Sequence, residues 1–131
     1  MKNEQELMMK LGFFEQQIRQ IQQQIQAIEQ GIVEMSSLNA GLEGIQGKKD
    51  EEILAPIGRG IYARAKLLSE ELLVNVGSNN LVTKSIPDTR KLIGEQIKKL
   101  EEIKVEMNNN LENLGREIES VMEEEKEKHK D

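Results

Sequence analysis

The sequence predicts a mainly helical α+β fold, in which two long helices form an antiparallel coiled-coil hairpin with two β-hairpins at one end. The first and last thirds of the chain repeat apolar residues in alternating steps of four and three, which is typical of coiled coils. The middle third alternates apolar and polar residues between tight turns, which is typical of β-hairpins. Only three of the 131 residues are aromatic and 32% are charged, a composition unlike that of a domain with one central core.

These patterns divide the chain, which we expect to be a single domain over 1–131, into four segments. Helices of about 40 residues exceed those of ordinary globular domains and must pair with each other or with another chain. The expected segments are a first coiled-coil helix over 1–47, two β-hairpins over 48–86, a second coiled-coil helix over 87–125 and a frayed, charged tail over 126–131.

The first helix carries its apolar residues at a and d positions, here called the seam, over four heptads. The positions between them are rich in glutamine, a good helix former that leaves the opposite face polar. After Met35 two registers are open. In one, Asn39 takes the next core position; in the other, the seam shifts to Leu38 and continues through Leu42 and Ile45. The seam positions are Leu7, Leu11, Phe14, Ile18, Ile21, Ile25, Ile28, Ile32 and Met35.

The second helix is expected to begin near Pro87, which needs no N–H partner in the first turn. Either Ser85 or Asp88 can cap the free N–H groups there. Its seam contains one charged residue, Lys104. The seam positions are Ile93, Ile97, Leu100, Lys104, Met107, Leu111, Leu114, Ile118 and Val121.

The charge on the second seam suggests how the two helices align. If the chain turns near residue 67, Lys104 lies opposite Glu29 or Gln30. A charge pair at that point would fix the register of two otherwise uniform seams.

The middle segment predicts four strands. The first hairpin is expected over 53–67, with Pro56 at an edge and Gly58-Arg59-Gly60 as its tight connection. The second is expected over 72–84, with its turn at 77–80. Isolated hairpins are marginally stable in water and expose unpaired edges, so they predict strand pairing with other subunits.

Motifs for catalysis or cofactor binding are weak. The segment 58–63 fits a relaxed dinucleotide-binding pattern, but that pattern needs a following helix, and the residues after it alternate like a strand. The chain has no cysteine and one histidine, His129, which removes the commonest metal and acid–base sites. The acidic clusters 50–52 and 123–125 lack the ligand spacing of a calcium loop. We therefore expect no enzyme activity, no cofactor and no metal.

The net charge and the hydropathy of the chain argue against two classes of partner, nucleic acids and membranes. The net charge of −6 disfavours nucleic acid, because phosphate binding needs a concentrated basic surface. No apolar run approaches the roughly 20 residues that cross a bilayer, and the first residues do not resemble a signal peptide. We expect a cytoplasmic protein that binds neither nucleic acid nor membrane.

The start of the first helix has more apolar side chains than a seam requires. Met8, Met9 and Phe13 lie beside the seam positions and extend the apolar surface to nearly all faces. In one interpretation, Phe13 packs on Met122 and widens the local core. In the other, the tip offers an exposed, adaptable apolar surface to partners. The sequence favours neither.

The order helix, two hairpins, helix resembles the α class of prefoldin subunits over nearly the whole chain. The stretch 52–65, with its Pro-Ile-Gly-x-Gly-x-aromatic element at 56–62, is similar to the strand signature of that family, as is Val74-Asn75-Val76-Gly77. Four strand segments rather than two favour the α class over the β class. Ala55 departs mildly from the family, which often has valine before this proline.

The resemblance implies an ATP-independent holdase chaperone: a hexamer of two α-type and four β-type subunits whose hairpins form a double β-barrel. The coiled-coil tips would hold unfolded polypeptides and deliver them to a group II chaperonin. Carried over by position, the client-binding tip residues are Leu7, Met8, Met9, Leu11, Phe13, Phe14, Val121 and Met122. The residues for subunit assembly are Ile53, Leu54, Ile57, Ile61, Leu67, Leu72, Val74, Val76, Leu81 and Val82.

Two other functions fit the same pattern. A filament or scaffold protein would pair its hairpins end to end without closing. An adaptor associated with transcription or membranes would bind one specific partner without competition from unfolded protein.

Overall fold

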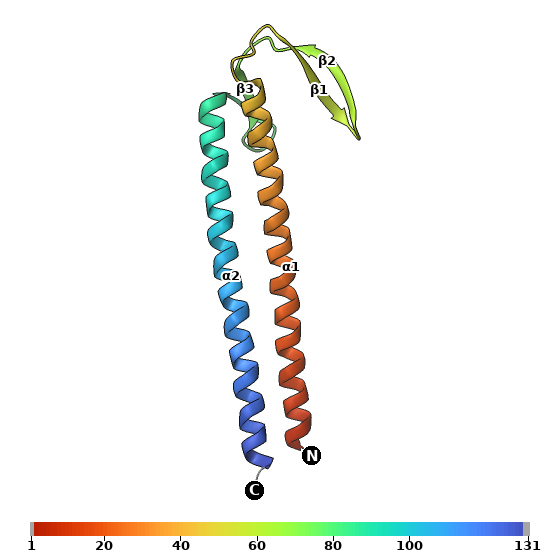
Figure 1. The fold of residues 1–131 in the computed structure, drawn as a ribbon, viewed down its shortest axis with the longest axis vertical. Coiled ribbons are helices and arrows are strands. Elements are labelled where there is room, and N and C mark those ends of the chain that lie inside the picture. The colour runs from red at the N-terminus through yellow and green to blue at the C-terminus, as the bar shows by residue number, and fades with distance from the viewer. Residues whose placement is uncertain (1, 130–131) are drawn as a thin grey trace. The chain divides into compact units, whose positions relative to one another are not determined.

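The computed structural model describes residues 2–129 and contains two helices and four strands (Figure 1). Its contacts divide the chain into two compact units. The first unit joins the chain up to Ile32 with the chain from Lys99 onward, and the second is Val33–Lys98. The elements are α1 (Lys2–Ile45), β1 (Glu52–Gly58), β2 (Ile61–Lys66), β3 (Glu71–Asn75), β4 (Leu81–Ser85) and α2 (Ile86–His129). The predicted fold class of two long helices and two β-hairpins is confirmed.

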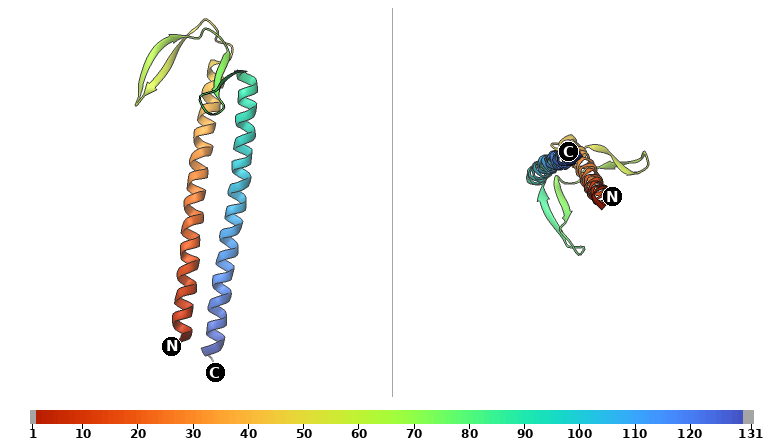
Figure 2. Two further views of the ribbon diagram at one scale, coloured as in Figure 1. Left: turned by 180° about the vertical axis from the view of Figure 1, so that it is seen from behind. Right: turned by 90° about the horizontal axis from the view of Figure 1, so that it is seen from below.

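In the first unit, segments of α1 and α2 lie side by side and run in opposite directions (Figures 1 and 2). Every predicted seam position in this unit is buried or half-buried, and Ile25 is the most buried of those on α1. Full burial of an aliphatic side chain contributes roughly 1.5–3 kcal/mol, so each half-buried position contributes less. The stability of this unit is therefore spread over many seam contacts.

The predicted charge pair on the seam is present. The Lys104 ammonium nitrogen lies 3.2 Å from a carboxylate oxygen of Glu29, and both side chains are partly exposed. The aliphatic part of Lys104 covers the seam while its charged end reaches the edge of the coil. This position of Glu29 confirms the alignment of the two helices predicted from the sequence.

We expect Glu29→Ala to lower the free energy of unfolding by less than about 1 kcal/mol, because a partly exposed ion pair is screened by solvent. The same variant, with one spin label on the α1 segment and one on the α2 segment, should show a broader distribution of distances between the two labels. The chain has no cysteine, so two introduced cysteines carry the labels uniquely. Glu15→Ala, an equal loss of charge at an exposed position of α1, is the matched control. Equal behaviour of the two variants would show that the pair does not set the register.

The second unit resolves the register that the sequence leaves open after Met35. Asn39 is half-buried and takes the next core position, whereas Leu38 is 54% exposed. Leu42 and Ile45 are also half-buried, so the seam follows the first register at Asn39 and reaches Ile45 at the end of α1. The Asn39 side-chain oxygen accepts a hydrogen bond of 3.1 Å from the Arg90 Nε of α2. A polar residue is tolerated at this core position because its hydrogen bond is satisfied there.

Arg90 also reaches the C-terminal turns of α1. One terminal guanidinium nitrogen donates to the Gln46 side-chain oxygen at 3.2 Å, and the other lies 3.5 Å from a Glu43 carboxylate oxygen. The last turn of α1 has no basic residue of its own. The positive charge of Arg90 therefore lies at the carbonyl end of α1, where a cation interacts favourably with the helix dipole.

The start of α2 is fixed by a cap. Ser85 Oγ accepts a hydrogen bond of 3.2 Å from the Asp88 N–H, so Ser85 is the capping residue of the two candidates. The Thr89 hydroxyl donates to the Ser85 carbonyl at 2.8 Å. Ile86, the first residue of the helix, is only 1% exposed and anchors this end of the unit.

The charged tail differs from expectation. Helix α2 continues to His129, so residues 126–129 of the expected tail 126–131 are helical. Glutamate and lysine are good helix formers, and the alternation of their charges over this segment supports a helix rather than opposing it. Residues 130–131 lie outside the described residues.

The four strands form two separate two-stranded antiparallel sheets, β1 with β2 and β3 with β4. In the first turn, Arg59 and Gly60 both have positive φ, 50° and 77°, as a two-residue type I′ turn requires. A bulge between Pro56 and Gly58 shifts the register just before it. The Gly-x-Gly motif is thus a hairpin turn followed by a strand, as predicted.

The second hairpin turns through Ser78 and Asn79, whose φ angles are 51° and 61°. The Asn80 N–H donates to the Gly77 carbonyl at 2.9 Å, and the Asn75 side-chain oxygen accepts from the Gly77 N–H at 2.9 Å. Asparagine tolerates the left-handed conformation better than most residues, which suits this turn.

Candidate functional site

The first candidate surface lies where α1 begins and α2 ends. Four of the eight predicted tip residues are half-buried on the seam: Leu7, Leu11, Phe14 and Val121. The other four, here called the tip surface, are mainly exposed. They are Met8 (73%), Met9 (76%), Phe13 (59%) and Met122 (51%). The sequence pattern therefore separates coil-forming from surplus apolar positions correctly.

The exposure of the tip surface bears on the two interpretations of its apolar residues. If Phe13 and Met122 widened the core, both side chains would be largely buried, but more than half of each is exposed. The Phe13 ring instead lies tilted beside the ring of Phe14, with centroids 6.4 Å apart and planes at 59°. The half-buried Phe14 thus supports an exposed aromatic side chain.

The second candidate surface is formed by the two hairpins. Five of the ten predicted assembly residues are mainly exposed, and a sixth, Val82, is 36% exposed; the five are Leu54, Ile57, Ile61, Val76 and Leu81. The remaining four are half-buried: Ile53, Leu67, Leu72 and Val74. The structure gives both sheets free outer edges along the described strands. Apolar side chains and unpaired strand edges together favour partners that add strands.

Sequence reasoning missed three exposed apolar residues of the hairpins, which are Tyr62, Leu68 and Leu73. A signal for Leu73 was present, because Leu72-Leu73-Val74 is a continuous apolar run. Such runs are typical of strands that are covered on both faces. Leu73 points to the opposite face from its two neighbours, which are half-buried.

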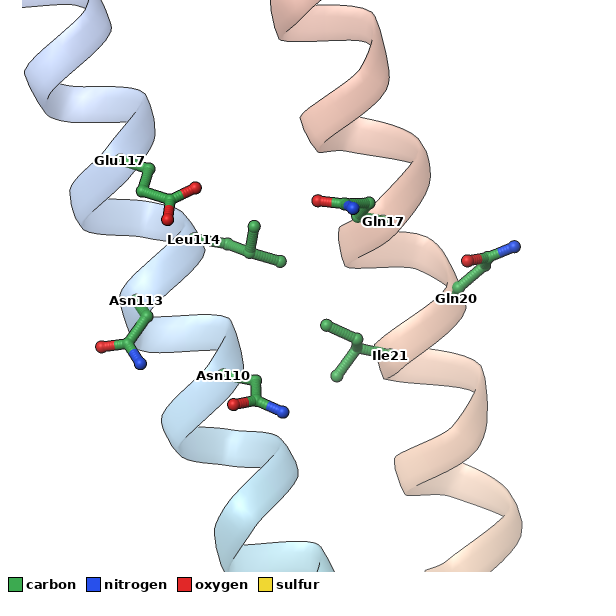
Figure 3. A pocket seen from close by; sticks show the side chains of 7 residues that line it. All are labelled: Gln17, Gln20, Ile21, Asn110, Asn113, Leu114 and Glu117. Atoms are coloured by element: carbon green, nitrogen blue, oxygen red, sulfur yellow. The ribbon is translucent and has the colours of Figure 1, made fainter.

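A groove within the first unit was not predicted (Figure 3). It has a volume of about 400 Å³, and the side chains of Ile21 and Leu114 point toward each other across it. Its lining includes one carboxylate and otherwise amide and aliphatic side chains. The lining residues are Gln17, Gln20, Ile21, Asn110, Asn113, Leu114 and Glu117. Glu117 is the one ionisable side chain in this lining, so no second acid, base or nucleophile of the lining stands beside it.

The described part of the chain offers neither a metal-binding cluster nor a membrane-spanning helix. No group of three or more His, Cys, Asp or Glu residues is arranged there to hold a metal ion. None of the described helices is long and apolar enough to cross a bilayer.

Comparison with known proteins decides the family. The model of the family described as "Prefoldin subunit" matches residues 14–131. The chain belongs to the prefoldin family. Relatives named prefoldin subunit alpha place it as an archaeal-type α subunit. The family and the names of these relatives support the role of a chaperone subunit for this prefoldin chain.

Two of these relatives show the extent of the likeness. Prefoldin subunit alpha of Methanobrevibacter smithii is 32% identical over 98 residues, which cover 74% of this chain and 67% of that protein. The protein of the same name in Thermofilum pendens is 33% identical over 106 residues, covering 77% of this chain and 82% of that one.

A solved structure shows the same fold. The cryo-EM structure of filamentous PFD from Methanocaldococcus jannaschii matches with a TM-score of 0.73 at 21% identity. The match covers 85% of this prefoldin chain and 93% of that one.

Proposed function

We propose that this prefoldin α subunit acts in an ATP-independent, cytoplasmic holdase that captures unfolded polypeptides at its coiled-coil tips and delivers them to a group II chaperonin. The observation that carries the proposal is the tip surface, where Met8, Met9 and Phe13 are each more than half exposed. Soluble proteins rarely expose clustered apolar side chains without a partner. Methionine suits varied partners because its unbranched thioether adapts to many shapes.

Capture of a client would be driven by burial of apolar surface, at about 25 cal/mol per Å². A single tip offers few side chains, so it binds weakly and releases without nucleotide. Several tips in one assembly would act together, since the second contact is made at a high effective concentration. This arrangement holds a polypeptide firmly while leaving each contact exchangeable.

Assembly would use the hairpins. We expect two copies of this chain to combine with four β-class subunits, with the strands of all six joining in a double β-barrel. The free strand edges and the exposed Leu54, Ile57 and Leu81 support this arrangement, because a barrel pairs every edge and covers apolar faces.

The test mixes this chain with a β-class subunit and measures the mass of the product and its suppression of aggregation by a chemically unfolded client, without nucleotide. The expected result is one closed species with the mass of a hexamer and full protection in the absence of ATP. An open distribution of lengths would contradict the closed assembly and favour the filament alternative. A closed hexamer that gives no protection would contradict the holdase function.

A further inference from the structure

Three of the four residues of the tip surface are methionines. Met8, Met9 and Met122 are 73%, 76% and 51% exposed. The other two methionines whose surroundings the structure describes, Met35 and Met107, are half-buried on the seams of α1 and α2. Exposure therefore separates the methionines of the tip surface from those that hold the coil together.

Because the chain has no cysteine, the methionine thioether is its side chain most easily converted from apolar to polar by a small oxidant. Peroxides oxidise methionine to its sulfoxide, and exposed side chains react more readily than buried ones. The methionine sulfur loses two electrons and takes one oxygen atom from the peroxide. The O–O bond breaks, and the second oxygen leaves as water when the oxidant is hydrogen peroxide.

We propose that Met8, Met9 and Met122 form a reversible oxidation site through which peroxide switches off client binding. This inference rests on the proposed function, since it concerns the same tip surface. Each sulfoxide places a strong hydrogen-bond acceptor where the client would bury apolar surface, and that acceptor must lose its water. Reduction by a thiol-dependent methionine sulfoxide reductase reverses the step: two thiols become a disulfide and the oxygen leaves as water.

The lower exposure of Met35 and Met107 lets mild oxidation change the tip surface without disturbing the coil. Met35 and Met107 contribute to the seams, where a sulfoxide would disturb packing of the coil. Because both are half-buried, mild oxidation reaches the tip surface first. Phe13 is chemically inert to peroxide and keeps part of the apolar surface throughout.

The experiment treats the assembled complex with graded hydrogen peroxide, locates sulfoxides by peptide mass spectrometry and measures suppression of client aggregation. The matched variant is Met8→Leu/Met9→Leu/Met122→Leu, which keeps apolar side chains and helix propensity but removes the three sulfur atoms. It also controls for oxidation of the β-class subunits. Circular dichroism and mass follow the integrity of the coil and of the assembly.

We expect sulfoxides at Met8, Met9 and Met122 before Met35 and Met107, with loss of protection, an unchanged assembly and recovery after reductase treatment. The leucine variant should keep its protection at the same peroxide concentration. Equal loss in the leucine variant, or earlier oxidation of Met35 or Met107, would overturn the inference.

A serine variant separates this inference from the function on which it rests. If Met8→Ser/Met9→Ser/Phe13→Ser abolishes protection but complete oxidation of the tip methionines does not, the oxidation switch alone is wrong. If the serine variant protects as well as the wild type, the tip is not the client site and both proposals fail.

Discussion

Replacing Met8, Met9 and Phe13 by serine is expected to remove most of the aggregation suppression that the assembly gains from this chain, while its mass and helix content stay unchanged. Each of these side chains is more than half exposed, so its loss costs the coil little. Against a client, each contributes up to roughly 1.5–3 kcal/mol when it is buried. Because every 1.4 kcal/mol is tenfold in affinity, a loss of about 3 kcal/mol over the three side chains reduces binding at one tip about a hundredfold.

The matched control for the tip variant is Val33→Ser/Val105→Ser. These valines are also about 60% exposed but lie on the helices away from the tip surface. We expect the control to protect the client like the wild type. Equal loss in both variants would show that binding depends on the total exposed apolar area rather than on the tip.

The second large effect concerns the hairpins. Leu54→Asp/Leu73→Asp should prevent assembly with the β-class subunit, as measured by light scattering after size exclusion. Both leucines are mainly exposed in the single chain, at 64% and 71%, so the substitution removes little contact from its own fold. In a closed barrel, however, an unpaired carboxylate would have to lose its water, which costs several kcal/mol per group.

Val105→Asp is the control for the hairpin variant, because it places the same charge on an exposed apolar position of α2. This control should assemble normally. An intact hexamer from the hairpin variant would contradict assembly through these faces. Circular dichroism checks that the helices remain folded in both variants.

The coiled coil was predictable in detail because its pattern depends only on periodicity. The alternating steps of four and three assigned the half-buried seam positions of both helices. The single charge at Lys104 pointed to Glu29 or Gln30 opposite it, and Glu29 makes the pair. The hairpin turns followed from residues that adopt positive φ, such as Gly60 and Asn79. Each of these signals is local or repeats regularly.

The contact between Asn39 and Arg90 was not predictable. Asparagine is a poor residue for a seam position because its polar side chain needs a partner. The guanidinium of Arg90, 51 positions away in the sequence, donates the hydrogen bond that Asn39 accepts. The prediction of the hairpin faces was also incomplete, since Tyr62 in β2 and Leu73 in β3 are exposed in the single chain. Alternation assigns one face of a strand to a core, whereas partner strands can cover both faces.

The tip was predictable only in part. The sequence showed that Met8, Met9 and Phe13 exceed what the seam needs, but it did not decide between a wider core and an exposed surface. That choice depends on the distance to the neighbouring helix, which periodicity does not give. The structure shows that these side chains are exposed.

The most direct test of client capture at the tips is site-specific photo-crosslinking. A photoreactive phenylalanine analogue replaces Met9 in one variant and Val105 in another, both at exposed positions. Each variant is assembled with the β-class subunit, mixed with an unfolded client and illuminated. We predict strong crosslinks to the client from position 9 and few from position 105. Crosslinks mainly from position 105 would contradict capture at the tips and place the client along the coil.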